Sequence, residues 1–195
     1  MKTKERPSLY GAVFLLVAVN RRFIIIFASD MASFIVTLQL QPDDAAFFNR
    51  MRRQYYPAHA NEVHAHLTLF YRLPADEPQI ITSLATMVAR PSFVLQVNEV
   101  QRYTNGIAYT LISGELQALH EALQTQWAPW LIPRDRQALR PHITIMNQVT
   151  AFKAQQAHEQ LMANFRPFEV TATGVEVWRY LKGPWKLVGE YSFLT

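Results

Sequence analysis

Two short segments of the sequence combine a histidine and a threonine two positions apart within an apolar run. The first is His66-Leu67-Thr68-Leu69 and the second is His142-Ile143-Thr144-Ile145. Successive side chains of a β-strand point to opposite faces, so each histidine shares a face with its threonine while the apolar side chains face the core. Two such strands, lying close together, would surround a small anion with two imidazoles and two hydroxyls.

These residue types suit proton transfer at such an anion. An imidazole can give or take a proton near neutral pH, because its reference pKa is about 6.5. Two imidazoles flanking the anion can therefore act together as general acid and general base. The threonine hydroxyls can donate hydrogen bonds to the oxygens on which negative charge accumulates. The acidic residues do not cluster, so the sequence does not suggest a bound magnesium ion.

Hydrophobic periodicity and turn residues predict the elements that position these segments. Helices are expected to begin near Pro42, to follow Asp76-Glu77-Pro78, and to cover 115–128 and 151–165. The last of these should turn Phe152 and Met162, with Leu161 and Phe165, toward the core. Arg50, Arg52 and Arg53 are interpreted as a solvated helix face, the alternative being contact with a nucleic-acid backbone. The strands are expected over residues 34–40, 63–71, 93–103, 107–112, 141–148, 168–173, 175–181 and 185–193, with turns at 105–106 and 182–184.

The chain also contains an internal duplication. His66 and His142 are 76 positions apart, and Phe93 and Phe168 are 75 apart. Glu99-Val100-Gln101-Arg102-Tyr103 matches Glu176-Val177-Trp178-Arg179-Tyr180 at a shift of 77. This period is far longer than that of solenoid repeats. It predicts an α+β fold in which two similar lobes are related by a pseudo-two-fold axis that brings the motif strands together.

The paired His-x-Thr-x motifs in two similar lobes resemble the 2H phosphoesterase superfamily, and more closely its branch of RNA 2′,3′-cyclic phosphodiesterases, also called 2′-5′ RNA ligases. The resemblance covers roughly residues 34–193. It implies two pseudo-symmetric lobes of antiparallel sheet lining a central cleft, with helices outside. It also implies hydrolysis of a 2′,3′-cyclic phosphate to a 2′-phosphate without a metal or another cofactor. His66 would be the proton donor and His142 the proton acceptor, while Thr68 and Thr144 would hold the phosphate.

Three other roles remain open from the residues themselves. The cleft could bind a nucleotide without turning it over, or it could join 2′-5′ RNA ends. His64 shares a face with His66 and could form half of a metal site, but its counterpart is Arg140, so no metal site is predicted. Tyr71, Tyr180 and Trp185 are candidates for stacking on a nucleobase. The remaining histidines, His59, His120 and His158, are interpreted as structural.

Composition limits the partners. The chain of 195 residues has no cysteine, and 50% of it is hydrophobic. Residues 1–30 carry a net charge of +3 of the total +4, so the remainder is nearly neutral. We therefore expect a short RNA 3′ end or a small cyclic nucleotide as the ligand rather than a long polyanion.

Residues 1–30 differ from the rest of the chain. A basic start leads into the apolar run 9–19, which Arg21 and Arg22 interrupt before 23–27. The segment could be a poor signal, a poor anchor, or sequence upstream of a start at Met31. We expect it to lie outside a domain formed by residues 31–195, which would be a cytoplasmic monomer without stable membrane association.

Overall fold

The computed structural model describes residues 14–19, 22–27, 32–180 and 185–194. Contacts divide the chain into two units, residues 1–31 and 32–195. In the first unit, β1 (Phe14–Val19) pairs antiparallel with β2 (Arg22–Phe27). The interpretation of residues 1–30 as sequence outside the domain stays a prediction. Within the described residues, no helix has the length and apolar character needed to cross a membrane.

In its described residues, the second unit contains four α-helices and a sheet of seven antiparallel strands. Its first half contains β3 (Ser33–Leu40), α1 (Pro42–Tyr55), the 3₁₀ turn η1 (Ala58–Ala60), β4 (Leu67–Pro74), α2 (Pro78–Met87) and β5 (Phe93–Tyr103). Its second half contains β6 (Gly106–Ile112), α3 (Gly114–Trp127), β7 (His142–Met146), α4 (Ala151–Asn164), β8 (Phe168–Tyr180) and β9 (Lys186–Ser192). The α+β class predicted from the sequence is confirmed.

The order of the strands brings the two motif strands to the two ends of one sheet. The order is β4-β3-β8-β5-β6-β7, and β9 pairs with β8. On one edge, β8 pairs with β3. On the other edge it pairs first with β5 and then with β9, so it runs through both lobes. The terminal strands β4 and β7 nevertheless contact each other. The sheet therefore curves until its two motif strands meet.

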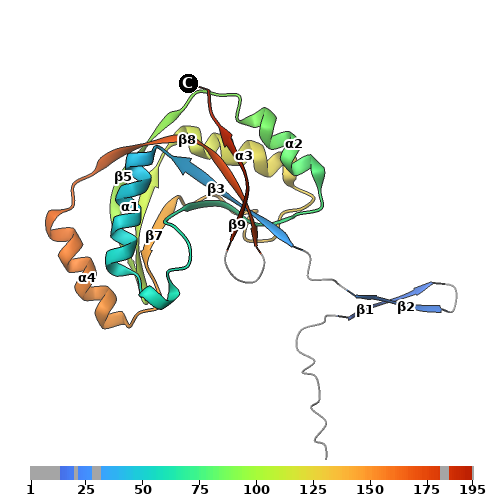
Figure 1. Cartoon of the computed structure of the whole chain (residues 1–195), viewed down its shortest axis with the longest axis horizontal. Coiled ribbons are helices and arrows are strands. Elements are labelled where there is room, and N and C mark those ends of the chain that lie inside the picture. The colour runs from blue at the N-terminus through green and yellow to red at the C-terminus, as the bar shows by residue number, and fades with distance from the viewer. Residues whose placement is uncertain (1–13, 20–21, 28–31, 181–184, 195) are drawn as a thin grey trace, which may run out of the picture. The chain divides into compact units, whose positions relative to one another are not determined.

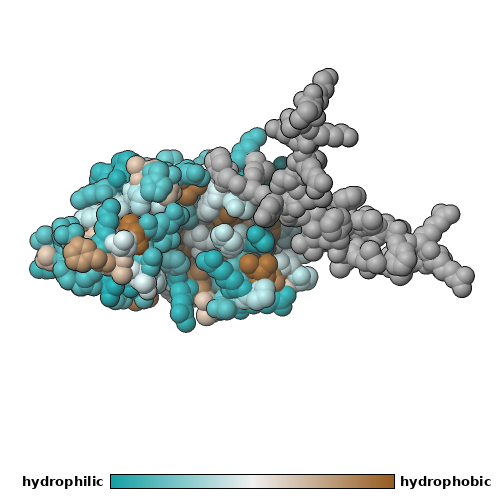
Figure 2. Space-filling view, turned by 90° about the horizontal axis from the view of Figure 1, so that it is seen from below, coloured by the Kyte–Doolittle hydropathy of each residue, from teal (hydrophilic) through white to brown (hydrophobic). Residues whose placement is uncertain are grey.

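The helices form two pairs on the outside of the sheet (Figure 1). α2 packs against α3, and α3 contacts the first lobe, where Trp127 lies edge-on to Phe70 of β4 with ring centroids 4.9 Å apart. α1 contacts β7 and α4 contacts β5 and β6, so this pair covers the second lobe. Phe48 of α1 and Trp127 of α3 are among the largest fully buried side chains. On the surface, Figure 2 shows one face, where hydrophilic side chains predominate and apolar ones are scattered.

Matching β-bulges mark the duplication. In β4, Leu69 is the extra residue between the pairs Val36–Phe70 and Thr37–Thr68. In β7, Ile145 is the extra residue between Ile107–Met146 and Ala108–Thr144. Leu69 and Ile145 are 76 positions apart, the same interval as the two motifs, and each directly follows the motif threonine. A bulge re-aims neighbouring side chains, so both lobes set the direction of their motif in the same way.

The pairing register corrects one part of the predicted duplication. Asn98 of β5 and Thr173 of β8 are also bulged, and they differ by 75 positions. With that shift, Glu176 corresponds to Gln101 and not to Glu99, so the five-residue match at a shift of 77 is offset from the structural equivalence by two residues. A two-residue offset preserves the alternation of faces, so Val100 and Val177 are both buried in spite of it.

Three other expectations differ from the structure. The first motif strand starts at Leu67 instead of 63, because Ala65 N–H is bound by the Asn49 side chain and not by a neighbouring strand. The second is shorter than the predicted 141–148 and covers His142–Met146. The two strands expected over 168–181 are one continuous strand, since the bulge at Thr173 bends β8 without ending it. The turn expected at 182–184 lies outside the described residues.

Candidate active site

The motif residues lie where the sequence places them relative to the core. His66 directly precedes β4, and His142 is the first residue of β7. Leu67, Leu69, Ile143 and Ile145 are all buried, which confirms the predicted alternation. The histidines and threonines are only partly buried, so they form the opposite, accessible face.

Both histidines are oriented by the same backbone contact. His66 Nδ1 lies 2.7 Å from the carbonyl oxygen of His64, and His142 Nδ1 lies 2.8 Å from that of Arg140. A carbonyl oxygen can only accept, so each Nδ1 carries the hydrogen and donates it. This fixes the tautomer and leaves each Nε2 free to take a proton when the ring is neutral, or to give one when it is charged.

The structure brings the two motifs together. Thr68 of the first motif and His142 of the second line one cavity of ≈190 Å³. The charge of His142 also acts on the pKa of His66. Arg134 and Arg140 line the same cavity together with one acid, Asp135, so its charged side chains are mainly cationic and suit a phosphate group.

Arg52 is a site residue that the sequence analysis missed. The sequence pattern assigns it to a solvated helix face, but it is only 5% exposed. Its Nη1 donates to the carbonyl oxygen of Thr144 (2.8 Å) and its Nε donates to Asn61 Oδ1 (2.7 Å). The guanidinium also lies 3.9 Å from the centroid of the Tyr56 ring. Arg50 and Arg53 are exposed, as expected for that face.

The electrostatics distinguish His66 from an ordinary histidine. Burial is the main reason that the pKa of His66 falls to about 4. The hydrogen bond to the His64 carbonyl opposes this shift, while the positive charges of Arg52 and His142 add to it. A negative ligand placed among these groups would favour the charged imidazole and raise this pKa again.

The three predicted stacking residues have different positions. The Trp185 ring lies 4.6 Å from the His66 ring, so the structure brings this residue to the motif. Tyr71 lines the cavity with Thr68 and His142, where the Arg134 guanidinium lies 4.9 Å from its ring centroid. Tyr180 lines neither that cavity nor the one beside Trp185, because it is the last residue of β8, opposite Ser33.

Two of the other histidines, His120 and His158, lie against backbone carbonyl groups of the sheet. His120 is buried, stacks on Phe70 at 4.7 Å, and its Nε2 donates to the carbonyl oxygen of the bulged residue Leu69 (3.2 Å). His158 Nε2 similarly lies 2.9 Å from the Val100 carbonyl oxygen. Across the described part of the chain, no group of three His, Cys, Asp or Glu side chains could hold a metal ion.

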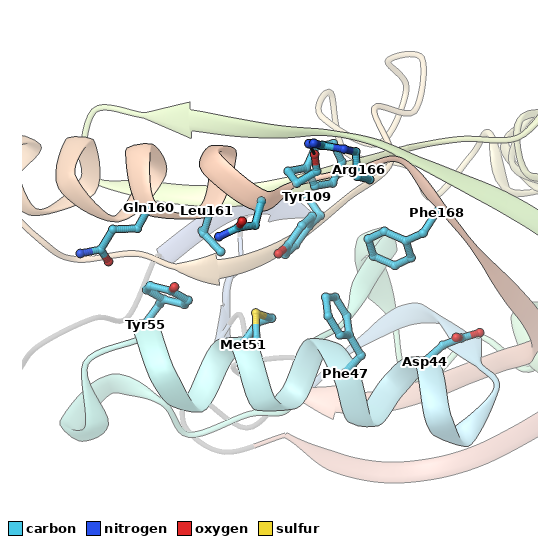
Figure 3. Close-up of a pocket in the computed structure, with 11 residues that line it drawn as sticks. Asp44, Phe47, Met51, Tyr55, Tyr109, Gln160, Leu161, Arg166 and Phe168 are labelled. Carbon is cyan, nitrogen blue, oxygen red and sulfur yellow. Dashed lines mark hydrogen bonds between the residues drawn. The ribbon is translucent and has the colours of Figure 1, made fainter.

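A larger cavity, of ≈570 Å³, lies between α1 and α4 and contains none of the four motif residues. Figure 3 shows Phe47, Met51 and Tyr55 of α1 facing Tyr109 and Phe168 across it. The Phe47 and Phe168 rings are 5.2 Å apart. Volume alone therefore does not identify the site, since this cavity lacks the paired histidines.

Known proteins share this fold. Escherichia coli LigT complexed with 3′-AMP is 14% identical, with a TM-score of 0.56 over 85% of this chain and 100% of that chain. LigT complexed with NADP⁺ is 16% identical, with a TM-score of 0.55 over 85% and 100%. TT0787 of Thermus thermophilus is 17% identical, with a TM-score of 0.58 over 83% and 97%. At these identities the similarity establishes the fold alone.

Comparison at the level of sequence gives two results. Among curated proteins, the sequence has no significant match. The sequence profile of the 2′-5′ RNA ligase superfamily matches residues 40–184, which is most of the chain and includes both motifs. The chain therefore belongs to the 2′-5′ RNA ligase superfamily.

Proposed function

We propose that this protein is a cyclic phosphodiesterase that hydrolyses 2′,3′-cyclic phosphates of RNA ends or small nucleotides to 2′-phosphates, without a metal ion. The observation that carries the proposal is the pair of equivalent contacts from His66 and His142 to the backbone. Each backbone carbonyl binds the Nδ1 atom of its histidine, so the Nε2 atom is available for proton transfer. The superfamily and the nucleotide complexes of LigT are consistent with a ligand of this class.

In the proposed reaction, a water oxygen attacks the phosphorus and the bond from phosphorus to the 3′-oxygen breaks. His142 Nε2 takes the proton of the water, and His66 Nε2 gives a proton to the departing 3′-oxygen. The products are a 2′-phosphate and a free 3′-hydroxyl. His66 is neutral in the free protein near pH 7, since its pKa is about 4. The cyclic phosphate anion raises that pKa on binding and so allows His66 to act as the acid.

The threonines have a separate role. Thr68 and Thr144 donate their hydroxyl hydrogens to the two non-bridging oxygens, where charge increases in the transition state. One such donor contributes about 2–4 kcal/mol. A serine can replace either threonine in this role, but a valine cannot.

The test is release of 2′-phosphate from a 2′,3′-cyclic nucleotide in buffer containing EDTA. We expect activity to persist with the chelator and to fall about 10²–10⁴-fold in His66→Ala and His142→Ala. His59→Ala is the matched control, because His59 is exposed in η1. Full activity in His142→Ala would remove the basis of the proposal.

Ligation is the second candidate, and the description of the superfamily favours it. In this reaction a 5′-hydroxyl oxygen takes the place of water: it attacks the phosphorus of the 2′,3′-cyclic phosphate and gives its proton to His142 Nε2, while His66 Nε2 gives a proton to the departing 3′-oxygen. Incubation of two RNA fragments with these ends tests this directly. A 2′-5′ product that both histidine variants fail to form would add this activity to hydrolysis.

A further inference from the structure

A second cavity lies beside His66 and contains neither Arg134 nor Arg140. It has a volume of ≈330 Å³, and His64, His66, Glu176, Trp178 and Trp185 are among the residues that line it. The Trp185 ring lies 4.6 Å from the His66 ring and 6.3 Å from the Trp178 ring. A flat aromatic group could therefore stack directly beside the reacting phosphate.

A fixed carboxylate faces this aromatic site. Thr37 Oγ1 donates to Glu176 Oε2 (3.1 Å) and accepts from Trp178 Nε1 (2.9 Å). The hydroxyl of Thr37 is thus oriented by the indole and in turn orients the carboxylate. Thr37 uses one lone pair of Oε2, so the second lone pair of Oε2 and both lone pairs of Oε1 of Glu176 can accept from a ligand.

The register of the strands sets the distance between this carboxylate and the catalytic residues. Thr68 of β4 is paired with Thr37 of β3, which is paired with Glu176 of β8. Directly paired residues share a face, and two strand spacings amount to about 10 Å. One nucleoside can bridge this separation, with its phosphate at Thr68 and its base at Glu176.

The charged residues that line the two cavities indicate which of them receives the base. The cavity that contains Thr68 and His142 also contains Arg134 and Arg140 against a single acid, Asp135, whose Oδ2 already accepts from the backbone N–H groups of Tyr71 and Arg72. The cavity beside Trp185 contains Glu62 and Glu176 instead. Phosphates of the RNA chain are attracted by the first and repelled by the second, while a base that offers hydrogen-bond donors suits the second.

We propose that Glu176 selects guanine as the base of the terminal cyclic nucleotide, which stacks on Trp185 while Glu176 accepts from its N1–H and N2–H groups. The proposal rests on the proposed phosphodiesterase function. On its Watson–Crick edge, guanine presents two neighbouring donors to a carboxylate. Adenine, cytosine and uracil place an acceptor next to each donor on that edge, and a carboxylate repels it. Glu176 is thus a specificity-determining residue.

The experiment compares kcat/KM for the four 2′,3′-cyclic nucleoside monophosphates. We expect the wild type to prefer the guanosine substrate at least about tenfold, the effect of one hydrogen bond to a charged group. Glu176→Gln keeps the shape and an oxygen for Thr37. This variant should lose the preference for guanosine. It should gain activity on the adenosine substrate, because adenine N1 can accept from the amide N–H₂ of glutamine and adenine N6–H can donate to the amide oxygen. Glu190→Gln is the control. Glu190 of β9 is paired directly with Glu176 of β8, but it does not line the cavity.

The outcomes separate the two proposals. Equal kcat/KM for all four bases in an active protein would overturn the guanine proposal and leave the phosphodiesterase proposal standing. If no cyclic nucleotide is hydrolysed, the phosphodiesterase proposal fails, and binding of the four 2′-nucleotides, followed by tryptophan fluorescence, tests the base site. Tighter binding of 2′-GMP that Glu176→Gln abolishes would support the base site, and equal affinities would contradict it.

Discussion

The Nη1 atom of Arg52 donates a 2.8 Å hydrogen bond to the carbonyl oxygen of Thr144. This contact ties α1 to the bulge of the second motif strand, at the residue that precedes Ile145. In the first motif strand, His120 of α3 binds the carbonyl of the bulged Leu69. A bulge interrupts the hydrogen bonds of a ladder, so each lobe uses a helix side chain to satisfy the backbone beside its threonine.

We expect Arg52→Met to lower the stability of the fold and to raise the pKa of His66. The variant leaves the Thr144 carbonyl and the Asn61 side chain without their donor, which costs about 1–3 kcal/mol for each buried group left unsatisfied. It also removes a positive charge that lowers the pKa of His66, so this pKa should rise. Urea denaturation measures the first effect, and NMR titration of the His66 ring measures the second.

Arg50→Met and Arg53→Met are the matched controls for Arg52→Met, because both residues are exposed on the same helix. They should change neither the urea midpoint nor the titration of His66. A similar loss of stability in all three variants would mean that the contacts of Arg52 are not specific to the site.

The low pKa of His66 predicts that anion binding takes up a proton. The free histidine is neutral above pH 4, its pKa being about 4, while a bound anion raises that pKa. Affinity for sulfate, which does not titrate in this range, should therefore increase as the pH falls from 6.5 toward 4, by at most about tenfold per pH unit for one proton.

Calorimetric titration of sulfate at several pH values measures this increase. His66→Gln should lose the part of the pH dependence that His66 contributes, and His59→Gln should keep it. The same dependence in His66→Gln as in the wild type would show that another group takes up the proton.

The order of acid and base can be tested with an altered leaving group. If His66 protonates the departing 3′-oxygen, a substrate with sulfur at that position needs no acid, because a thiol has a reference pKa of about 8.5. His66→Ala should then recover most of its lost activity on the sulfur substrate, whereas His142→Ala should not. Recovery in His142→Ala instead would reverse the two roles.

The sequence predicted features that depend on local pattern. The alternation of His66, Leu67, Thr68 and Leu69 determines which side chains face the core, and it can be read without knowing the tertiary structure. Arg52 shows the limit. Three arginines lie close together on one helix, and only the packing of α1 against β7 distinguishes the buried one from the others.

Helix α4 shows the same limit for apolar residues. The apolar pattern predicts Phe152 and Met162 on the inner side, but Phe152 is 78% exposed and Met162 is 43% exposed. The buried residues of α4 are Ala154 and Ala157, whose small side chains let the helix approach β5 closely. Hydrophobicity alone predicts that the large apolar residues face the core. Close packing of a helix on a sheet can instead place small residues at the contact.

We expect Gly106→Ala to disturb the second motif strand from outside the active site. A Cβ atom on Gly106 would collide with the carbonyl oxygen of Met146, the last residue of β7. Backbone atoms cannot move away as a flexible side chain can, so the strand that carries His142 and Thr144 must shift. We expect a loss of about 1–3 kcal/mol in the free energy of unfolding, together with lower kcat on a cyclic nucleotide.

Gly114→Ala is the control, because a Cβ there meets no atom within 4 Å at the start of α3. This variant should be neutral or should stabilise the protein by about 0.4–1 kcal/mol. Urea midpoints measure the difference, and equal midpoints and rates for the two variants would contradict the close approach of β6 and β7 at Gly106.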